Sequence, residues 1–582
     1  MKVNELSIIV GGQAGDGITQ AGVNLGLACL RGGLHVFGAN DYQSLIRGGH
    51  NFYILRISGE KIFSQTDFVD LLLSLNEETI TLHKDELTAG AGIIYDGEEV
   101  TLNEEEFEKA EIKLFPIPLM KIVRDLNGPS IARNSVIVGA TISLVNYDLE
   151  LLLNTIKESF EGKEKVATLN MNAAKAGYDY MEVHYKNKFD YKLEKLGATT
   201  PKRMMLTGAE AIGLGAIQAC CKFYAGYPMT PTTPLLHFMA SLQREYNMIV
   251  IQVESEIAAI NMIVGASFAG ARAMTATSGG GFCLMSEGLG MAGMTETPVV
   301  IMLGQRPGPS TGLPTYTSQG DLRFAIHAGQ GEFPRVIIAP GDVAECFYKT
   351  MEAFNLAERY QIPAIIITDK YLLESHESAE FFDTSKVGVD RGLLISGEYL
   401  DEVEYKRYKI TENGISPRAV PLTKNTIVRA NSDEHNEAGY TTENPQLTTQ
   451  MTDKRYRKLE ALTKELESME TIKTFGAEKS DATIIGWGST KGPILEAMKI
   501  LEKEGLKANY LQVIYIAPFP AAKVSKILEN ANKTVIVENN KTAQLAQIIK
   551  EKTKFAIEHA ILKYDGRPFN PVSLSKQIEE VF

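Results

Sequence analysis

The sequence has no long hydrophobic run: no stretch approaches the roughly 18 apolar residues that a membrane-spanning helix needs. It contains few cysteines and no CxxC pair, which excludes a disulfide scaffold and argues against a cysteine-ligated metal cluster within this chain. The five are Cys29, Cys220, Cys221, Cys283 and Cys346. A basic block is also missing, and the formal net charge of −13 argues against electrostatically driven nucleic-acid binding. The opening MKVNELSIIVGG lacks the cationic start and cleavage region of a secretion signal, so we expect a cytoplasmic protein without a membrane partner.

What the sequence does have is a repeated alternation of short apolar runs with helical patterns, which is typical of parallel sheets covered by helices. The length of 582 residues predicts about three to five domains. We expect an α/β fold with three doubly wound-type domains at residues 1–190, 200–375 and 471–582. The polar segment 376–470 predicts an extended connector with a few short elements, including a helix near 454–468.

The glycine-rich stretch GGQAGDGITQAG follows the first predicted strand and opens a helix. Its glycines, Gly12 and Gly15 among them, would let backbone N–H groups approach an anion at the helix N-terminus. A turn that packs the helix on the strand explains them equally well. The GDG triplet mimics the start of a thiamine-diphosphate metal motif, but Asn40 stands in a different local context, so we predict no metal here. Farther on, Arg47 before two glycines is either a phosphate ligand or a solvated turn residue.

A rigid tract, YPMTPTTP, follows a predicted strand in the second domain. Its prolines fix the loop backbone and so hold the hydroxyl of Thr230 at the carboxyl end of that strand. Ligands of open α/β sheets bind at this edge. A helix cap by Thr232 or Thr233 would account for one threonine, though not for the whole tract.

Acidic residues, glycines and an arginine mark the next strand ends. Glu254 and Glu256 stand where a strand gives way to an apolar helix. Taken alone, such an acid commonly complements the helix dipole, but a carboxylate in these apolar surroundings is suited to sharing a proton with a ring nitrogen. Three adjacent glycines in SGGG permit close approach of a ligand or a partner chain. Arg306 ends another strand, where it is either a carboxylate clamp or a member of a surface ion pair.

In this order, YPMTP, SE at the head of the next helix, SGGG and GQRPGPSTGLPT resemble the α subunit of 2-oxoacid:ferredoxin oxidoreductases. The opening GGQAGDGI and the later RGG resemble the γ domain of the same family, fused ahead of the α part. NSDEHNEAGY at Asn431–Tyr440 is similar to a connector motif of the family, and the last domain resembles its transketolase-C-like domain. The fused layout resembles the 2-oxoglutarate group of the family.

The resemblance implies a thiamine-diphosphate enzyme that works at a subunit interface. In the family, the central domain of the α chain binds the aminopyrimidine half of the cofactor. A separate β subunit binds the diphosphate and magnesium and carries an iron–sulfur cluster. The reaction would decarboxylate a 2-oxoacid, pass electrons to ferredoxin and transfer the acyl group to coenzyme A. We expect a dimer of αβ heterodimers.

The same resemblance assigns roles to single residues. Glu256 would hydrogen-bond the pyrimidine ring nitrogen and favour the imino tautomer that removes the thiazolium proton. Thr230 would orient the carboxylate or keto oxygen of the substrate, and Arg306 would pair with the carboxylate. Further cofactor contacts are implied for Tyr227, Pro228, Gly279 and Gly280. Further substrate or coenzyme A candidates are Thr315, Tyr316, Arg47, Gly12 and Gly15.

One position bears on the substrate. Relatives of the 2-oxoglutarate type often have a basic residue after GLPT, whereas this chain has Tyr316, and a phenol cannot supply positive charge. A cation from the partner, or Arg323, would have to compensate. Aliphatic, aromatic and dicarboxylic 2-oxoacids stay open, with 2-oxoglutarate favoured. Two other functions also stay open: a dinucleotide-binding oxidoreductase that uses the glycine turn, and a non-catalytic assembly subunit.

Overall fold

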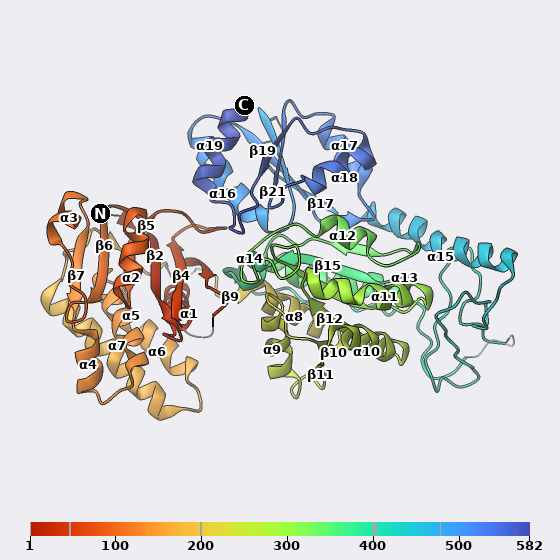
Figure 1. The fold of residues 1–582 in the computed structure, drawn as a ribbon, viewed down its shortest axis with the longest axis horizontal. Coiled ribbons are helices and arrows are strands. Elements are labelled where there is room, and N and C mark those ends of the chain that lie inside the picture. The colour runs from red at the N-terminus through yellow and green to blue at the C-terminus, as the bar shows by residue number, and fades with distance from the viewer. Residues whose placement is uncertain (1, 46–47, 198–200, 400–403, 478) are drawn as a thin grey trace. The chain divides into compact units, whose positions relative to one another are not determined.

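The computed structural model describes residues 2–45, 48–197, 201–399, 404–477 and 479–582 (Figure 1). The chain forms two compact units. Unit 1 contains Met1–Leu206, Ser375–Phe381 and Asn570–Val572, and unit 2 contains Thr207–Glu374, Phe382–Phe569 and Ser573–Phe582. None of the described helices is both long enough and apolar enough to cross a membrane.

Unit 1 is built on an eight-stranded sheet with the order β7–β6–β5–β2–β4–β3–β16–β9. These strands are β2 (Glu5–Ala14), β3 (His35–Asp41), β4 (Gly48–Ser58), β5 (Val69–Ser74), β6 (Leu87–Asp96), β7 (Lys113–Ile117), β9 (Arg203–Thr207) and β16 (His376–Glu380). A separate pair consists of β1 (Lys2–Val3) and β8 (Tyr191–Lys192). Strand β16 lies inside the segment 376–470, for which we expected an extended connector. It is a strand of this sheet because it pairs with β3.

The sheet of unit 1 is mixed rather than parallel throughout. Strands β2, β5, β6 and β7 run parallel, but β4 pairs antiparallel with both β2 and β3. The physical reason is the short connection between β3 and β4, which can join antiparallel strands but not parallel ones. Alternating β2 side chains point to the two faces of the sheet, so that Ile8 and Val10 join one core and Ile9 the other.

Helices cover both faces of this sheet. The larger core includes side chains of α1 (Ile18–Arg31), α4 (Leu119–Asp125), α5 (Arg133–Leu144), α6 (Leu149–Ser159) and α7 (Glu164–His184). Figure 1 shows α4 to α7 gathered as one group. The opposite core receives side chains from α2 (Glu77–His83) and α3 (Glu104–Lys109). Unit 1 is therefore a three-layered α/β domain.

Unit 2 contains a seven-stranded sheet with the order β11–β10–β12–β13–β15–β14–β20. Its strands are β10 (Cys221–Gly226), β11 (Ile249–Gln252), β12 (Arg272–Thr277), β13 (Val300–Gln305), β14 (Val336–Ile338), β15 (Ala364–Asp369) and β20 (Tyr515–Ala517). All pairs are parallel except β14 with β20. The helices are α8 (Gly208–Gln218), α9 (Thr233–Leu242), α10 (Glu256–Phe268), α11 (Gly279–Met294), α12 (Leu322–His327), α13 (Val343–Tyr360) and α14 (Lys370–Glu374).

The C-terminal part of unit 2 forms a five-stranded sheet with the order β17–β19–β18–β21–β22. Its strands are β17 (Ile472–Gly476), β18 (Ala482–Gly486), β19 (Ala508–Val513), β21 (Thr534–Glu538) and β22 (His559–Leu562). The helices are α16 (Lys491–Lys503), α17 (Ala521–Leu528), α18 (Gln544–Thr553) and α19 (Pro571–Val581). Because β20 belongs to the larger sheet of unit 2, the two sheets share one hydrophobic core, to which Ile337 and Trp487 both belong.

The connector is held to unit 2 by buried ions rather than by a sheet. Its helix α15 (Pro445–Leu466) begins before the predicted helix, because Asn444 caps it and Pro445 occupies its first position. Both carboxylate oxygens of Glu296 accept hydrogen bonds from the Lys454 ammonium at 2.7 Å, and Lys458 pairs with the same carboxylate. All three of these charged side chains are buried.

Candidate active site

Glu256 is the first residue of α10, and its side chain is only 3% exposed. The helix cap is its neighbour Ser255, whose hydroxyl accepts a hydrogen bond from the Ala258 N–H. Among the described residues, Oε1 of Glu256 has no hydrogen-bond partner although it is buried. A buried carboxylate oxygen without a partner is costly, so this atom is a candidate for contact with a ligand.

A glycine on α11 makes room for this carboxylate. A methyl group at Gly281 would lie 2.5 Å from Glu256 Oε1 and 2.0 Å from Thr277 Oγ1. Of the predicted glycines, Gly279 instead meets Asp321, and a methyl group at Gly280 would meet nothing within 4 Å. The sequence indicated the glycine triplet as a whole. Only the position of each glycine around α11 shows that Gly281 is the one that faces Glu256.

We predict that Gly281→Ala destabilises the chain, whereas Gly280→Ala does not. The added methyl group in the first variant forces apart the Glu256 and Thr277 side chains, an overpacking cost of about 1–3 kcal/mol. In the second variant alanine gains helix propensity and meets no atom. Thermal unfolding of the two purified variants measures the difference. Equal melting temperatures would contradict the close approach at Gly281.

The YPMTP loop lies between β10 and α9. Thr232 closes the loop, since its hydroxyl donates to the Met229 carbonyl at 2.8 Å. The Ser278 hydroxyl donates to the sulfur of Met229 at 2.7 Å, which ties the loop to the head of α11. Thr230 is half-buried, and no hydrogen bond of its hydroxyl is found among the described residues. Tyr227 is 38% exposed and Pro228 is half-buried, so neither is enclosed by this chain alone.

Arg306 follows β13 and reaches the same loop. Its Nη1 donates to the Thr230 carbonyl at 2.9 Å, so the structure brings these two predicted site residues together. The guanidinium is half-buried, and burial lowers the pKa of Arg306 from its ordinary value. No carboxylate pairs with it among the described ion pairs. An arginine held in this way suits the binding of a ligand carboxylate.

Asp321 is a residue that the sequence analysis missed. It precedes α12, where an aspartate usually caps a helix, but its side chain makes no cap bond. Its backbone N–H instead donates to Gln305, and its carboxyl group lies against Gly279 at the start of α11. Burial raises the pKa of Asp321 to about 6. No local signal distinguishes this aspartate from an ordinary cap.

The loop after Arg306 contacts the C-terminal part of the chain. Thr315 is buried and its hydroxyl has no partner among the described residues. The ring of Tyr316 lies beneath the guanidinium of Arg567, which is 3.8 Å from the ring centroid. Arg323, the compensating cation considered from the sequence, pairs instead with Glu551 at 3.2 Å.

The glycine turn belongs to unit 1. Gly12 lies in β2, and Gly15 has a φ of +97°, a conformation that favours glycine. The carboxylate of Asp16 accepts from the Gln13 N–H at 2.9 Å and pairs with Arg133 at 3.0 Å. Asn40 accepts a hydrogen bond from Thr19. Arg47 lies outside the described residues, so its role stays a prediction.

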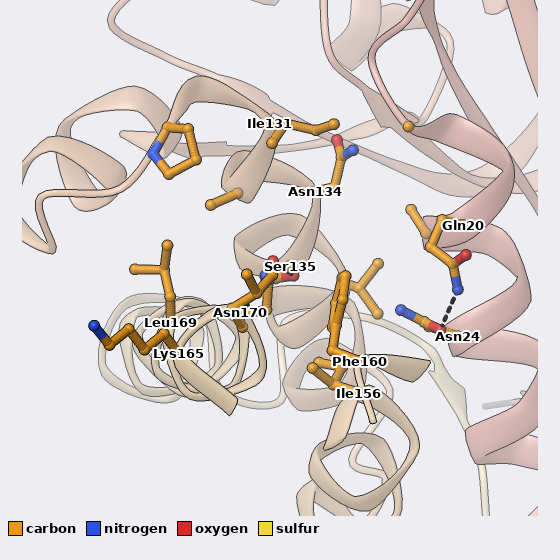
Figure 2. A pocket seen from close by; sticks show the side chains of 16 residues that line it. Gln20, Asn24, Ile131, Asn134, Ser135, Ile156, Phe160, Lys165, Leu169 and Asn170 are labelled. Carbon is orange, nitrogen blue, oxygen red and sulfur yellow. Dashed lines mark hydrogen bonds between the residues drawn. The ribbon is translucent and has the colours of Figure 1, made fainter. Parts of the chain in front are cut away.

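A cavity of about 450 Å³ lies beside this turn (Figure 2). It is bounded by α1, α5, α6 and α7 and has mostly apolar walls, with Phe160 and Leu169 among them. Asn134 also lines it, and its buried Oδ1 has no partner among the described residues. Unit 1 therefore offers a second place for a ligand.

Comparison with known proteins gives matches along nearly the whole chain. Residues 214–454 match the family described as "Pyruvate flavodoxin/ferredoxin oxidoreductase, thiamine diP-bdg". Residues 7–180 match "Pyruvate ferredoxin/flavodoxin oxidoreductase", and residues 480–573 match "Pyruvate:ferredoxin oxidoreductase core domain II". The first match contains Thr230, Glu256 and Arg306, and the last contains Arg567.

Individual relatives agree with these matches. The 2-oxoacid:ferredoxin oxidoreductase subunit alpha of Sulfolobus sp is 36% identical over 99% of this chain and 96% of its own length. The 2-oxoglutarate synthase subunit KorA of Methanothermobacter thermautotrophicus is 32% identical over 64% of this chain and 97% of its own. A solved structure of 2-oxoglutarate:ferredoxin oxidoreductase from Magnetococcus marinus, with 2-oxoglutarate, coenzyme A and succinyl-CoA bound, has a TM-score of 0.90 and 32% identity, covering 99% of each chain.

Fold and site together thus define an oxidoreductase subunit with a thiamine-diphosphate-binding domain. The chain belongs to the 2-oxoacid:ferredoxin oxidoreductase family, in which it is similar to the α subunits along its whole length. The sequence-based expectations of the family and of the α/β class with a γ-like domain are confirmed.

Proposed function

We propose that Glu256 holds a ring nitrogen of the aminopyrimidine half of thiamine diphosphate, and that the chain uses this cofactor to decarboxylate a 2-oxoacid. The observation that carries the proposal is the partnerless, buried Oε1 of Glu256 among the described residues. The cofactor fits this position chemically, since a ring nitrogen carrying or sharing a proton would satisfy that oxygen. Gly281 supplies the matching space on α11.

When bound, thiamine diphosphate supplies the electron sink that a 2-oxoacid needs to lose carbon dioxide. The residues of this chain prepare that chemistry. Oε1 of Glu256 shares a proton with the ring nitrogen in a site that its burial shields from water. Arg306 binds the substrate carboxylate, and the Thr230 hydroxyl orients the carboxylate or the keto oxygen. The Met229 and Thr232 contacts keep this loop rigid, so the substrate meets groups that are already in place.

The partner in this proposal is a β subunit that brings the diphosphate, magnesium and iron–sulfur sites and passes electrons to ferredoxin. Apolar side chains on the helices beside Glu256 support such an interface. Ile257 and Met262 on α10 are 53% and 40% exposed, and Leu284 on α11 is 51% exposed. Among the described residues, no group of three or more His, Cys, Asp or Glu is placed to hold a metal ion. A partner of this kind is consistent with the α-subunit relatives.

For the substrates we propose a 2-oxoacid, with 2-oxoglutarate favoured, and coenzyme A. Support comes from the Magnetococcus marinus enzyme, whose structure holds 2-oxoglutarate and coenzyme A. We assign coenzyme A to the γ-like domain, at the turn containing Gly12 and Gly15. The buried Oδ1 of Asn134 beside that turn, which has no partner among the described residues, is an acceptor for which the amide or amine N–H groups of coenzyme A are suitable donors.

The test is co-purification of the chain with its native β partner, followed by a panel of 2-oxoacids assayed with coenzyme A and a low-potential dye. We expect dye reduction that requires both the 2-oxoacid and coenzyme A. A complex that reduces the dye with no 2-oxoacid would defeat the proposal. Binding of a nicotinamide or flavin nucleotide by the chain alone would favour the dinucleotide-binding alternative.

We predict that Arg306→Ala raises the KM for the 2-oxoacid about 10- to 100-fold, the range for loss of a charge-assisted hydrogen bond. Bound thiamine diphosphate should remain, because the guanidinium contacts the Thr230 loop rather than Glu256. Steady-state kinetics and the cofactor content of the purified complex measure the two effects. Unchanged kinetics would reject the carboxylate clamp.

A further inference from the structure

Two buried histidines of unit 1 are joined by a hydrogen bond between their rings. His50 on β4 and His83 at the end of α2 are 8% and 3% exposed, and their Nε2 atoms are 2.8 Å apart. Nδ1 of His83 lies 2.8 Å from Oε2 of Glu86. Nδ1 of His50 is buried and has no partner among the described residues. The chain of hydrogen bonds therefore begins at a carboxylate and ends at a nitrogen without a partner.

The carboxylate fixes where the hydrogens of this chain lie. An ionised carboxylate only accepts hydrogen bonds, so Nδ1 of His83 carries a hydrogen and donates it to Glu86. The other nitrogen of a neutral ring is an acceptor, so Nε2 of His83 accepts from the Nε2–H of His50. Nδ1 of His50 then carries no hydrogen. In this arrangement each ring N–H group of the neutral pair has an acceptor.

An additional proton has no suitable place in the pair. If His50 takes it, the new hydrogen is on Nδ1. If His83 takes it, its Nε2 becomes a donor, and His50 must accept at Nε2 and carry its own hydrogen on Nδ1. In both cases a buried N–H group of His50 meets no acceptor among the described residues. Such a group is costly, so protonation works against the closed arrangement.

The surroundings of His50 act in the same direction. Burial, and after it the His83 ring, lowers the pKa of His50. Three carboxylates oppose this shift, those of Glu78 on α2, Asp41 on β3 and Glu86. Because the pKa in the folded chain lies below the unfolded value of about 6.5, the stability that the neutral ring contributes is present above that pH. It is lost as the pH falls from about 6.5 towards the lower folded value.

The histidine pair lies beside the glycine turn. His50 is directly opposite Gln13 in the pairing of β4 with β2, and Gly15 follows Gln13 by two residues. A methyl group at Gly11 would lie 3.2 Å from Cε1 of His50 and 2.5 Å from Cγ2 of Thr79 on α2. The His50 ring thus packs where β2 meets α2, and its displacement would loosen the contact between them.

We propose that His50 and His83 form an acid-sensitive contact between β4 and α2, which opens when the pair takes up a proton from solvent. On opening, the hydrogen bond between the two Nε2 atoms breaks and the protonated His50 ring turns towards water. The strand that leads into the glycine turn then loses the support of α2 in mildly acidic solution. The inference concerns unit 1 by itself and does not depend on the proposed function.

The test is hydrogen exchange of the full chain, measured by mass spectrometry at about pH 7.5 and about pH 5.5 and corrected for the intrinsic dependence of exchange on pH. We expect the protection of the backbone amides in α2 to fall about 5- to 10-fold, near the limit for one group with an unfolded pKa of about 6.5. Protection of α7, on the opposite face of the sheet, should change less than about twofold.

His50→Gln keeps a side-chain amide that can donate to His83 but takes up no proton, so its α2 protection should change less than about twofold between the two conditions. His184→Gln is the matched control, since it removes an exposed histidine from α7, and it should keep the wild-type fall. Each protein is compared with itself, so a uniform loss of stability does not affect the result. Unchanged protection of wild-type α2, an equal fall in α7, or a wild-type fall in His50→Gln would overturn the inference. The wild-type measurement decides the question alone if His50→Gln fails to fold.

Discussion

Replacing Glu256 by glutamine should lower the rate of 2-oxoacid oxidation by the complex about 100- to 10,000-fold, the range that general acid–base assistance usually supplies. Glutamine has nearly the same shape, and Gly281 leaves the same space for it. It cannot exchange a proton at the position of Oε1, however, so the cofactor would be bound without its proton partner. We expect the cofactor content of the complex to fall much less than its activity.

The chain supplies a matched control close by. Glu254 has the same side chain and stands at the same junction between β11 and α10, but it is exposed. Glu254→Gln should leave the rate within about twofold of wild type, because a solvated carboxylate has little differential effect on a buried site. Measured rates of the two variants in complexes of equal composition decide the question. If Glu256→Gln kept activity within a few-fold of wild type, the non-catalytic assembly role would be favoured.

Much of the fold could be predicted from apolar runs bounded by turn residues. The runs at 271–278, 298–305, 335–342 and 363–370 each contain a fully buried strand of the seven-stranded sheet, because strands buried on both faces are largely apolar. The run at 248–254 contains the edge strand β11, which is only partly buried. Pairing with distant strands could not be predicted. The polar strand β16 was missed, since only its pairing with β3 makes it a strand. The apolar run at 509–516 indicates one strand, but it divides into β19 and β20, and β20 pairs with β14 of the larger sheet. Pairing of this kind is a tertiary event with no local pattern.

The residues of the candidate site likewise fall into two groups, those that the sequence could identify and those that only the structure reveals. Thr230, Glu256 and Arg306 stand at strand ends, and the topology of a parallel sheet brings such ends to one edge. Gly281 was hidden in a triplet whose members differ only in helical phase. Arg567 is remote in sequence from the tyrosine on which it stacks, and nothing in its own segment marks it. Residues whose roles depend on chain segments meeting in space could be found only from the structure.

A second large effect concerns stability rather than catalysis. The carboxylate of Glu296 is the partner of two buried ammonium groups, those of Lys454 and Lys458 on α15. Burial alone would raise the pKa of Glu296, but the two lysines hold it below its ordinary value. Burial lowers the pKa of Lys458 to about 7. The three groups therefore depend on one another for their charged states.

We predict that Glu296→Ala lowers the free energy of unfolding by about 3–5 kcal/mol, the cost of leaving buried charges without their partner. In thermal unfolding this should appear as a fall in melting temperature of at least about 5 °C. The matched control is Asp179→Asn, which removes an exposed pair with Lys175 whose atoms are 2.9 Å apart. Its effect should be at most about 1 kcal/mol, because solvent screens such pairs.

A triple variant separates lost charge pairing from lost packing. Glu296→Met combined with Lys454→Met and Lys458→Met replaces the carboxylate and both lysine ammonium groups with apolar side chains of similar length. The buried Arg407 guanidinium, which also lies near Glu296, keeps its hydrogen bonds to the Gln361 side chain and to the Glu296 backbone carbonyl. We expect it to recover most of the stability that Glu296→Ala loses, since the unpaired ammonium groups and not the missing contacts cause the defect. If the triple variant melted as low as Glu296→Ala, packing would be the main cause. If Glu296→Ala had the same melting temperature as wild type, the buried ions would not be what holds α15 to unit 2.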